Sequence, residues 1–167
     1  MKLISILLVL FLLLPSCHKS TTKKSAPLVQ KGILDLRNWD FENDGPIFLN
    51  GEWEFFWKRL IHPDSIKNSS IQTGTYYQVP SLWNGKKLNN ELLKGKGFAT
   101  FRLKIISNKD QKLQIEIDEL LSSYKLWCNG NAIFECGKVS DSESGTIPRH
   151  IPVIESIDII KDTTVLV

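Results

Sequence analysis

The feature that most constrains the fold of this chain is a two-residue alternation of side-chain polarity in several short segments. In residues 98–106, the set Ala99, Phe101, Leu103 and Ile105 alternates with Phe98, Thr100, Arg102 and Lys104. Successive side chains of a β-strand point to opposite faces, so this period predicts a strand with one buried face. Similar segments lie at residues 48–57, 75–79, 113–117, 124–128, 132–136, 151–160 and 164–167. Short strands at this spacing predict an all-β sandwich.

Helical periodicity is scarce. The best candidate is a short turn at residues 58–61, which we expect to stop at Pro63 because proline disfavours helix in the residue before it. Residues 81–96 and 138–149 are rich in Gly, Asn and Ser and predict loops. The chain stops at Val167 within an apolar, strand-like run. That ending predicts either a short edge strand or a sandwich without its last strand or strands.

Asn129-Gly130 predicts a tight β-hairpin, because both central residues of the favoured turn need a positive φ. A two-residue turn there pairs Cys128 with Asn131 and Cys136 with Ser123. The two cysteines then lie roughly 17 Å apart along the ladder. A disulfide needs Cα atoms within about 7 Å. We therefore expect two free, buried thiols.

The N-terminus has the features of a secretory leader. Residues 3–14 form an apolar run after one positive charge, and a membrane-spanning helix would need about 20 residues. The next residues, Leu14-Pro15-Ser16-Cys17, resemble the lipobox of bacterial lipoproteins, with Pro15 in place of the usual small residue. The resemblance implies that Cys17 is lipidated and becomes the mature N-terminus, so that membrane lipid is a partner of the chain. Multiple acyl chains give stable anchoring.

These features divide the chain into a signal peptide at 1–16, a lipid-anchored flexible tether at 17–30 and a β-domain at 31–167. The tether begins with polar residues that cannot bury a core. Loss of Lys2 with the leader leaves 20 of the 21 basic residues against 18 acidic ones, a balance that argues against a nucleic-acid partner. We expect the protein in the bacterial cell envelope, at the outer membrane or on the periplasmic face of a membrane.

Four segments occur in an order typical of one domain family. They are Leu49-Asn50-Gly51-Glu52-Trp53-Glu54-Phe55, Val79-Pro80-Ser81-Leu82-Trp83-Asn84, Gly97-Phe98-Ala99-Thr100-Phe101-Arg102-Leu103 and Tyr124-Lys125-Leu126-Trp127-Cys128-Asn129-Gly130. The set resembles the periplasmic, galactose-binding-like jelly-roll sensor domain of bacterial seven-transmembrane receptors with diverse intracellular signalling modules. It is also similar to the N-terminal sugar-binding domain of glycoside hydrolase family 2. The resemblance covers residues 31–167 and implies a jelly roll that senses or binds a ligand, with carbohydrate as the expected class.

Three residues are candidates for ligand binding. Trp83 and Asn84 begin a long loop, where an indole can stack on a sugar and an amide can bind its hydroxyls. The alternative is that Trp83 plugs the end of the sandwich. Arg102 can clamp a carboxylate or sugar acid. The alternative is a structural ion pair with Glu116 or Asp118, because an unpaired buried charge is very costly.

Other chemical signals are weak. The aromatic stripe Trp53, Phe55 and Trp57 has strand spacing and is expected in the core. The histidines show no metal-ligand spacing; they are His18, His62 and His150. The loop residues Asp141, Glu143 and Ser144 lack the ligand density of a calcium loop. We expect no metal and no cofactor.

We therefore expect a non-catalytic, membrane-anchored lipoprotein with a ligand-sensing or carbohydrate-binding domain. The catalytic carboxylates of the resembling hydrolases lie in a barrel domain that this sequence lacks, which argues against an enzyme. Two alternatives remain open. One is a structural lipoprotein that docks on another envelope protein, and the other is a truncated remnant of a signalling receptor.

Overall fold

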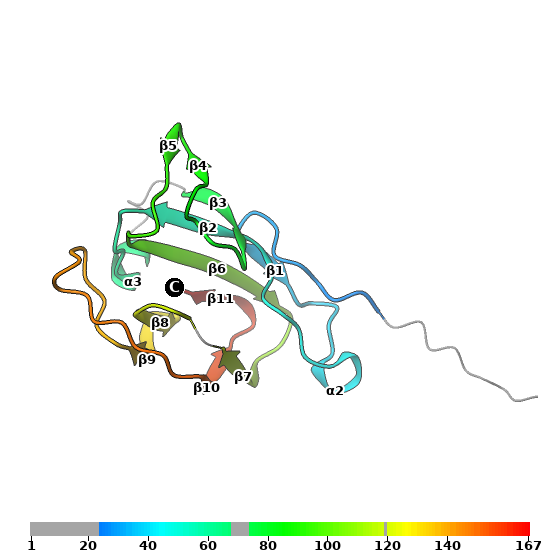
Figure 1. Ribbon diagram of the computed structural model, residues 1–167. Coiled ribbons are helices and arrows are strands. Elements are labelled where there is room, and N and C mark those ends of the chain that lie inside the picture. Colours follow the sequence, from blue (N-terminus) through cyan, green and yellow to red (C-terminus); the bar gives the residue numbers. More distant parts are fainter. Residues whose placement is uncertain (1–23, 68–73, 119) are drawn as a thin grey trace, which may run out of the picture.

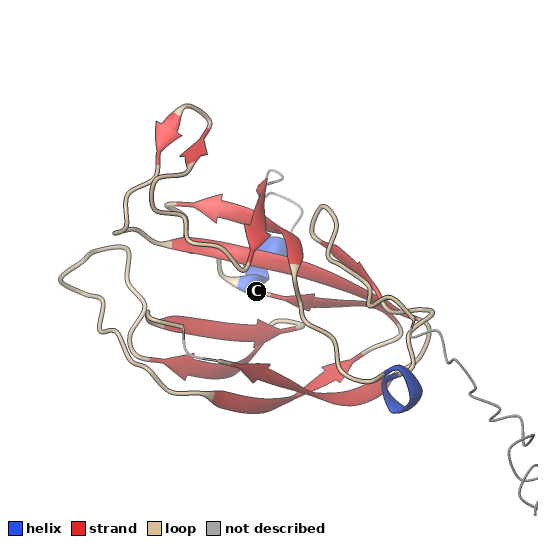
Figure 2. Ribbon diagram, turned by 45° about the vertical axis from the view of Figure 1, so that its right-hand side comes forward, coloured by secondary structure: helices blue, strands red, loops and turns tan. Residues whose placement is uncertain are grey.

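The computed structural model describes residues 24–67, 74–118 and 120–167, so the predicted signal peptide at 1–16 and the predicted lipidation site Cys17 lie outside the described residues. Strands dominate the described chain (Figures 1 and 2). They are β1 (Ile33–Asp35), β2 (Gly51–Trp57), β3 (Thr75–Val79), β4 (Lys87–Leu88), β5 (Glu91–Leu92), β6 (Ala99–Ser107), β7 (Gln111–Ile117), β8 (Tyr124–Cys128), β9 (Asn131–Cys136), β10 (Val153–Ile159) and β11 (Asp162–Leu166). The helices are α2 (Phe41–Asp44) and α3 (Pro63–Lys67).

The strands form an all-β sandwich, as the alternation predicts. The main sheet has the order β3-β2-β6-β11-β8-β9. β1 also belongs to it and pairs in parallel with the C-terminal part of β6, at residues 104–106. β7 and β10 form a separate antiparallel ribbon. Figure 1 shows β1, β2, β3 and β6 on one side of the molecule and β7, β8, β9 and β10 on the other, with β11 between them. The curved main sheet therefore supplies strands to both layers.

β11 contradicts one expectation about the C-terminus. It pairs with β6 on one side and β8 on the other, and Val167 exchanges two backbone hydrogen bonds with Trp127. Thr164 and Leu166 are fully buried. The prediction of a short edge strand is wrong, because these side chains fill the space between the two layers.

The β8–β9 hairpin forms at Asn129-Gly130, whose φ angles are 52° and 89°. Cys128 pairs with Asn131 as predicted, but Cys136 pairs with Tyr124 instead of Ser123. A bulge between Leu126 and Trp127 shifts the register of the hairpin by one residue between these two pairs. Both thiols are free and buried, as predicted.

Two local predictions are wrong. Residues 58–62 are not helical, and α3 begins at Pro63 where the helix was expected to stop. Proline is well suited to the first helical position because its missing N–H would have no partner there. Residues 87–92 form the β4–β5 hairpin within the expected loop. Its turn uses Asn89 and Asn90 at φ of 46° and 67°.

The folded domain begins before residue 31. The Val29 side chain is 2% exposed, and its backbone exchanges hydrogen bonds with Asn50 and Glu52. Lys24 forms an ion pair of 2.8 Å with Asp44. The lower domain boundary predicted at residue 31 therefore lies too late in the chain, because Val29 fills part of the core.

The interior has two clusters, which we call the large core and the aromatic cluster. The large core contains Val29, Leu34, Leu36, Trp39, Leu103, Ile105, Ile115, Leu126, Cys128, Ile157, Ile159 and Leu166. The aromatic cluster contains Phe55, Tyr77 and Leu93, with Trp57, Trp83, Leu88, Ala99 and Phe101 packed against them. The second cluster lies at the end of β2 that leads to the candidate site.

Candidate functional site

Trp83 lies against the aromatic cluster. Its ring is half-buried, 5.3 Å from the Trp57 ring and nearly perpendicular to it. Its indole Nε1–H donates to the Gly95 carbonyl over 3.3 Å. These contacts favour the alternative that Trp83 closes one end of the sandwich. Asn84, next to it, is exposed.

Arg102 pairs with a carboxylate, but not with either predicted one. Its guanidinium Nε and one terminal nitrogen both lie 2.5 Å from Oε2 of Glu54. The side chains are 11% and 7% exposed, and Gly74 N donates to the other Glu54 oxygen. Glu54 lies opposite Arg102 because β2 pairs with β6 in that register. The expected partners, Glu116 and Asp118, lie on and just after β7, which does not pair with β6.

The structure does not join the predicted residues into one site. Phe55, which contacts Trp83, lies next to Glu54 on β2. Adjacent residues of a strand point to opposite faces, so Trp83 and Arg102 lie on opposite faces of the main sheet. Of the predicted aromatic stripe, Phe55 is buried, while Trp53 and Trp57 are half-buried against the two clusters.

A different group of residues lines an open cleft of about 280 Å³ at the end of β2. Its walls come from the last residues of β2, the start of β3 and the β4–β5 hairpin, which rises from this part of the molecule in Figure 1. The lining residues are Phe55, Phe56, Trp57, Arg59, Gly74, Thr75, Leu88, Asn89 and Glu91. Phe55 and Phe56 are buried beneath this surface, so the half-buried Trp57 ring shares it with Arg59, Asn89 and Glu91.

The turn after β2 places Arg59 in the cleft wall. Lys58 has a φ of 55°, which ends the strand and redirects the chain. The Thr100 hydroxyl then fixes the segment, because it donates to the Arg59 carbonyl over 2.7 Å and accepts from Ile61 N over 2.9 Å. The Arg59 guanidinium lies 5.5 Å from the centre of the Phe56 ring. This arrangement holds a cation over an aromatic face.

Gly74 lets the chain pass close to β2 at the floor of the cleft. A Cβ atom there would lie 2.7 Å from the Phe55 carbonyl oxygen and 3.0 Å from a Glu54 side-chain carbon. Any larger residue would displace one of these groups. Glycine therefore permits the close approach of this segment to β2 at the cleft.

The Glu91 carboxylate, on the β4–β5 hairpin, is held by the side chain of Lys58 in the turn after β2. Lys58 Nζ lies 2.6 Å from its carboxylate, and this hydrogen bond lowers the pKa of Glu91 below its ordinary value. The Trp57 indole Nε1 is buried and has no partner of good hydrogen-bond geometry among the described groups. Glu91 therefore stays ionised, and the Trp57 N–H is a donor without a fixed acceptor.

Sequence reasoning missed the cleft. Arg59 was inside a segment predicted to be a helical turn, and Asn89 and Glu91 were inside a segment predicted to be loop. The Asn89-Asn90 pair was a usable signal, since asparagine tolerates the left-handed conformation that a tight hairpin turn needs. No local pattern brings residues 57–59, 74–75 and 88–91 together.

The other candidate groups remain apart. Within the described residues, no three His, Cys, Asp or Glu side chains are placed to hold a metal ion. His62 contacts Asp64, and Glu143 contacts Lys96. Burial raises the pKa of the Cys128 thiol, which keeps it protonated and unreactive. No helix in the described part of the chain is long and apolar enough to cross a membrane.

A scan against protein-family models finds no match, and a search of curated proteins finds no similar sequence. The cleft is therefore interpreted from its own chemistry.

Proposed function

We propose that this chain is a lipid-anchored protein of the bacterial cell envelope whose β-sandwich binds a saccharide, without catalysis, in the cleft beside the β4–β5 hairpin. The observation that carries the proposal is the lining of that cleft, where the half-buried Trp57 ring lies beside the exposed residues Arg59, Asn89 and Glu91. Apolar rings with a few convergent polar groups are typical of small-ligand sites. Rings suit the C–H face of a sugar, and planar polar side chains suit its hydroxyls.

The size of the cleft supports a small ligand. Its volume of about 280 Å³ is at the lower end of the range for ligand sites, roughly 300–1,000 Å³. One sugar residue, or the end of a saccharide chain, fits this volume. The cleft is open to solvent, so the rest of a longer chain can extend away from it.

The carboxylates argue against hydrolysis. A glycosidase places two carboxyl groups about the bond that breaks, and one of them has a raised pKa so that it can act as an acid. Glu91 is the only acidic residue among the described lining groups, and Lys58 lowers its pKa. The proposal is therefore binding, with Glu91 as an acceptor for sugar hydroxyls.

The saccharide proposal is tested by thermal unfolding of the full chain in detergent, alone and with a panel of neutral and acidic sugars. Binding to the folded state at a hundredfold excess over Kd stabilises it by about 2.7 kcal/mol. Asn89→Gly removes the cleft amide and tolerates the positive φ, while Asn90→Gly, also at a positive φ but not among the lining residues, is the matched control. We expect one sugar class to raise the melting temperature, Asn89→Gly to abolish that shift and Asn90→Gly to retain it.

The anchor is tested separately. Cells that express the chain are labelled with a radioactive fatty acid, and Cys17→Ser is the control. We expect label and membrane association in the parent chain and neither in the variant. Fatty-acid label that persists in Cys17→Ser would contradict lipidation at Cys17.

A second candidate function is docking on another envelope protein. It is favoured by three large apolar side chains on loops, Phe48, Leu82 and Leu121, which are 81%, 83% and 79% exposed. A cooperative melt that no sugar shifts, together with a stable complex with another envelope protein in a cross-linking experiment, would favour this candidate over saccharide binding.

A further inference from the structure

The two cations nearest the cleft differ in whether a carboxylate neutralises them. Lys58 is paired with Glu91, but Arg59 takes part in none of the ion pairs formed by the described residues. The undescribed residues 68–73, which precede Gly74, read Asn-Ser-Ser-Ile-Gln-Thr and contain no carboxylate. Lys58, Arg59 and Glu91 together therefore carry one positive charge in excess.

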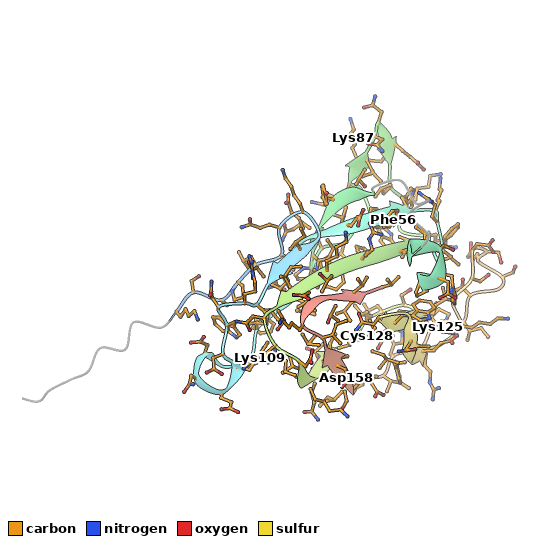
Figure 3. The ribbon with its side chains drawn as sticks, turned by 180° about the vertical axis from the view of Figure 1, so that it is seen from behind. Phe56, Lys87, Lys109, Lys125, Cys128 and Asp158 are labelled. Carbon is orange, nitrogen blue, oxygen red and sulfur yellow. The ribbon has the colours of Figure 1, made fainter. Side chains whose placement is uncertain are left out.

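The segment that forms the outer wall of the cleft is also basic. Residues 85–97 contain four lysines and one acidic residue, Glu91, although the whole chain is close to balance. The lysines are Lys86, Lys87, Lys94 and Lys96, all exposed, and Lys87 is visible on the hairpin above Phe56 in Figure 3. Among the described residues, only Lys96 of these four has an ion-pair partner, Glu143. Concentrated charge of one sign raises the local concentration of ligands of the other sign.

Arg59 and Arg102 form a matched pair about one ring. Their guanidinium carbons lie 5.5 Å and 5.4 Å from the centre of the Phe56 ring. Arg102 is nearly buried and has the Glu54 carboxylate against two of its nitrogens. Arg59 lies at a similar distance from the same ring but lines the open cleft. A planar guanidinium can bind a carboxylate through two parallel hydrogen bonds.

We infer that the ligand of the cleft is an acidic saccharide whose carboxylate is bound by Arg59, with a uronic acid as the simplest example. This inference rests on the proposed function, since it specifies the class of sugar for the same site. The carboxylate of the ligand forms an ion pair with Arg59, as the Glu54 carboxylate does with Arg102. The hairpin lysines attract the ligand, and the Trp57 ring and Glu91 contact its uncharged part.

The test measures the affinity of the full chain in detergent for galacturonate and galactose by calorimetry, with sodium acetate as a probe for the carboxylate alone. We expect galacturonate to bind at least tenfold more tightly than galactose and acetate. Arg59→Gln should remove this preference, and Arg59→Lys should retain part of it because the charge remains. Lys112→Gln, which removes an equal charge from β7 on the other side of the molecule, should change the affinity less than twofold.

The outcomes separate the inference from the proposed function. Equal binding of galactose and galacturonate overturns the inference and leaves saccharide binding intact, while binding of neither overturns both. A preference for galacturonate that survives in Arg59→Gln removes the role of Arg59. Should the Arg59 variants fail to fold, the parent chain still gives an answer: higher salt should weaken galacturonate binding and leave galactose binding unchanged. No effect of salt on galacturonate would overturn the inference.

Discussion

The large core and the aromatic cluster lie on the same face of the main sheet but are covered by different kinds of structure. Phe101, Leu103 and Ile105 point the same way from β6, the first into the aromatic cluster and the other two into the large core. Strands β7 and β10 cover the large core with the aliphatic side chains Ile115, Ile157 and Ile159. The aromatic cluster is covered instead by Trp83, Leu88 and Leu93, from the segment around the β4–β5 hairpin.

This difference relates stability to binding. The large core is closed by strands and rich in aliphatic contacts, and we therefore expect it to be the main source of stability. The aromatic cluster is covered only by a loop and by a hairpin whose strands have two residues each, and this cover leaves an open cleft at the edge of the cluster. The rings in the aromatic cluster also pack as tilted pairs, with 4.9 Å between the centres of Phe55 and Tyr77. Large flat side chains can therefore support a site where little secondary structure is available.

The largest expected effect lies on the opposite face of the sheet from both clusters. Glu54→Leu leaves the Arg102 charge nearly buried and unpaired, and we expect it to lower the free energy of unfolding by about 3–5 kcal/mol. Urea denaturation measures it. The double variant Glu54→Leu with Arg102→Met removes both charges and should regain most of the loss. A double variant as unstable as the single one would contradict the ion-pair interpretation.

Truncation in the large core should be nearly as damaging. Leu103 is fully buried, so Leu103→Ala should cost about 2–5 kcal/mol of unfolding free energy. The same urea experiment gives this value, and saccharide affinity of the remaining folded protein should stay unchanged. A loss below 1 kcal/mol would show that the strands do not make this region the stable one.

How much of this the sequence could predict differs between the two regions. The two-residue alternation marked β6, β7 and β10, and therefore most of the large core, because the period is a local property of the chain. The β11 strand was also predicted, but its central position was not, since pairing between distant strands leaves no local trace. The same reason explains why Glu54 was missed as the partner of Arg102.

The site was less predictable than the core. Trp83 was correctly placed at a loop start, and its alternative role as a plug fits its contacts with Trp57 and Gly95. The cleft itself depends on a turn at Lys58, a close approach at Gly74 and a hairpin at Asn89. Each of these is a backbone event in a different segment, and only the folded chain brings them together.

Truncation in the aromatic cluster should cost less than truncation in the large core. A fully buried tryptophan typically costs about 3–5 kcal/mol when cut to alanine, and Trp83 is half-buried, so Trp83→Ala should cost about 1–2 kcal/mol. Denaturation in urea again measures the change. The variant should also weaken saccharide binding, because Trp83 supports the Trp57 ring. A cost equal to that of Leu103→Ala would abolish the distinction between the two regions.

The smallest effect is expected at the rim of the large core, where Asp35 ends β1. The Arg37 side chain donates hydrogen bonds to it and lowers its pKa to about 2. A lowered pKa stabilises the fold at pH values above the ordinary carboxyl range, and this contribution disappears as the pH falls toward 2. Both side chains are largely exposed, at 45% and 59%, so the contribution is small. A carboxyl NMR titration should give the low pKa, and Arg37→Gln should raise it; an ordinary value in the parent chain would contradict the contact.

The most direct test of saccharide binding in the cleft is the NMR signal of the tryptophan indole N–H groups as an acidic saccharide is added to the full chain. Trp57 lines the cleft and has no fixed acceptor for its indole N–H, whereas those of Trp39 and Trp53 donate to the Gly45 and Leu49 carbonyls. We expect the Trp57 signal to shift progressively to saturation, while the Trp39 and Trp53 signals stay in place. Saturable binding that moves Trp39 or Trp53 and leaves Trp57 unchanged would put the ligand elsewhere and contradict the cleft as the binding site.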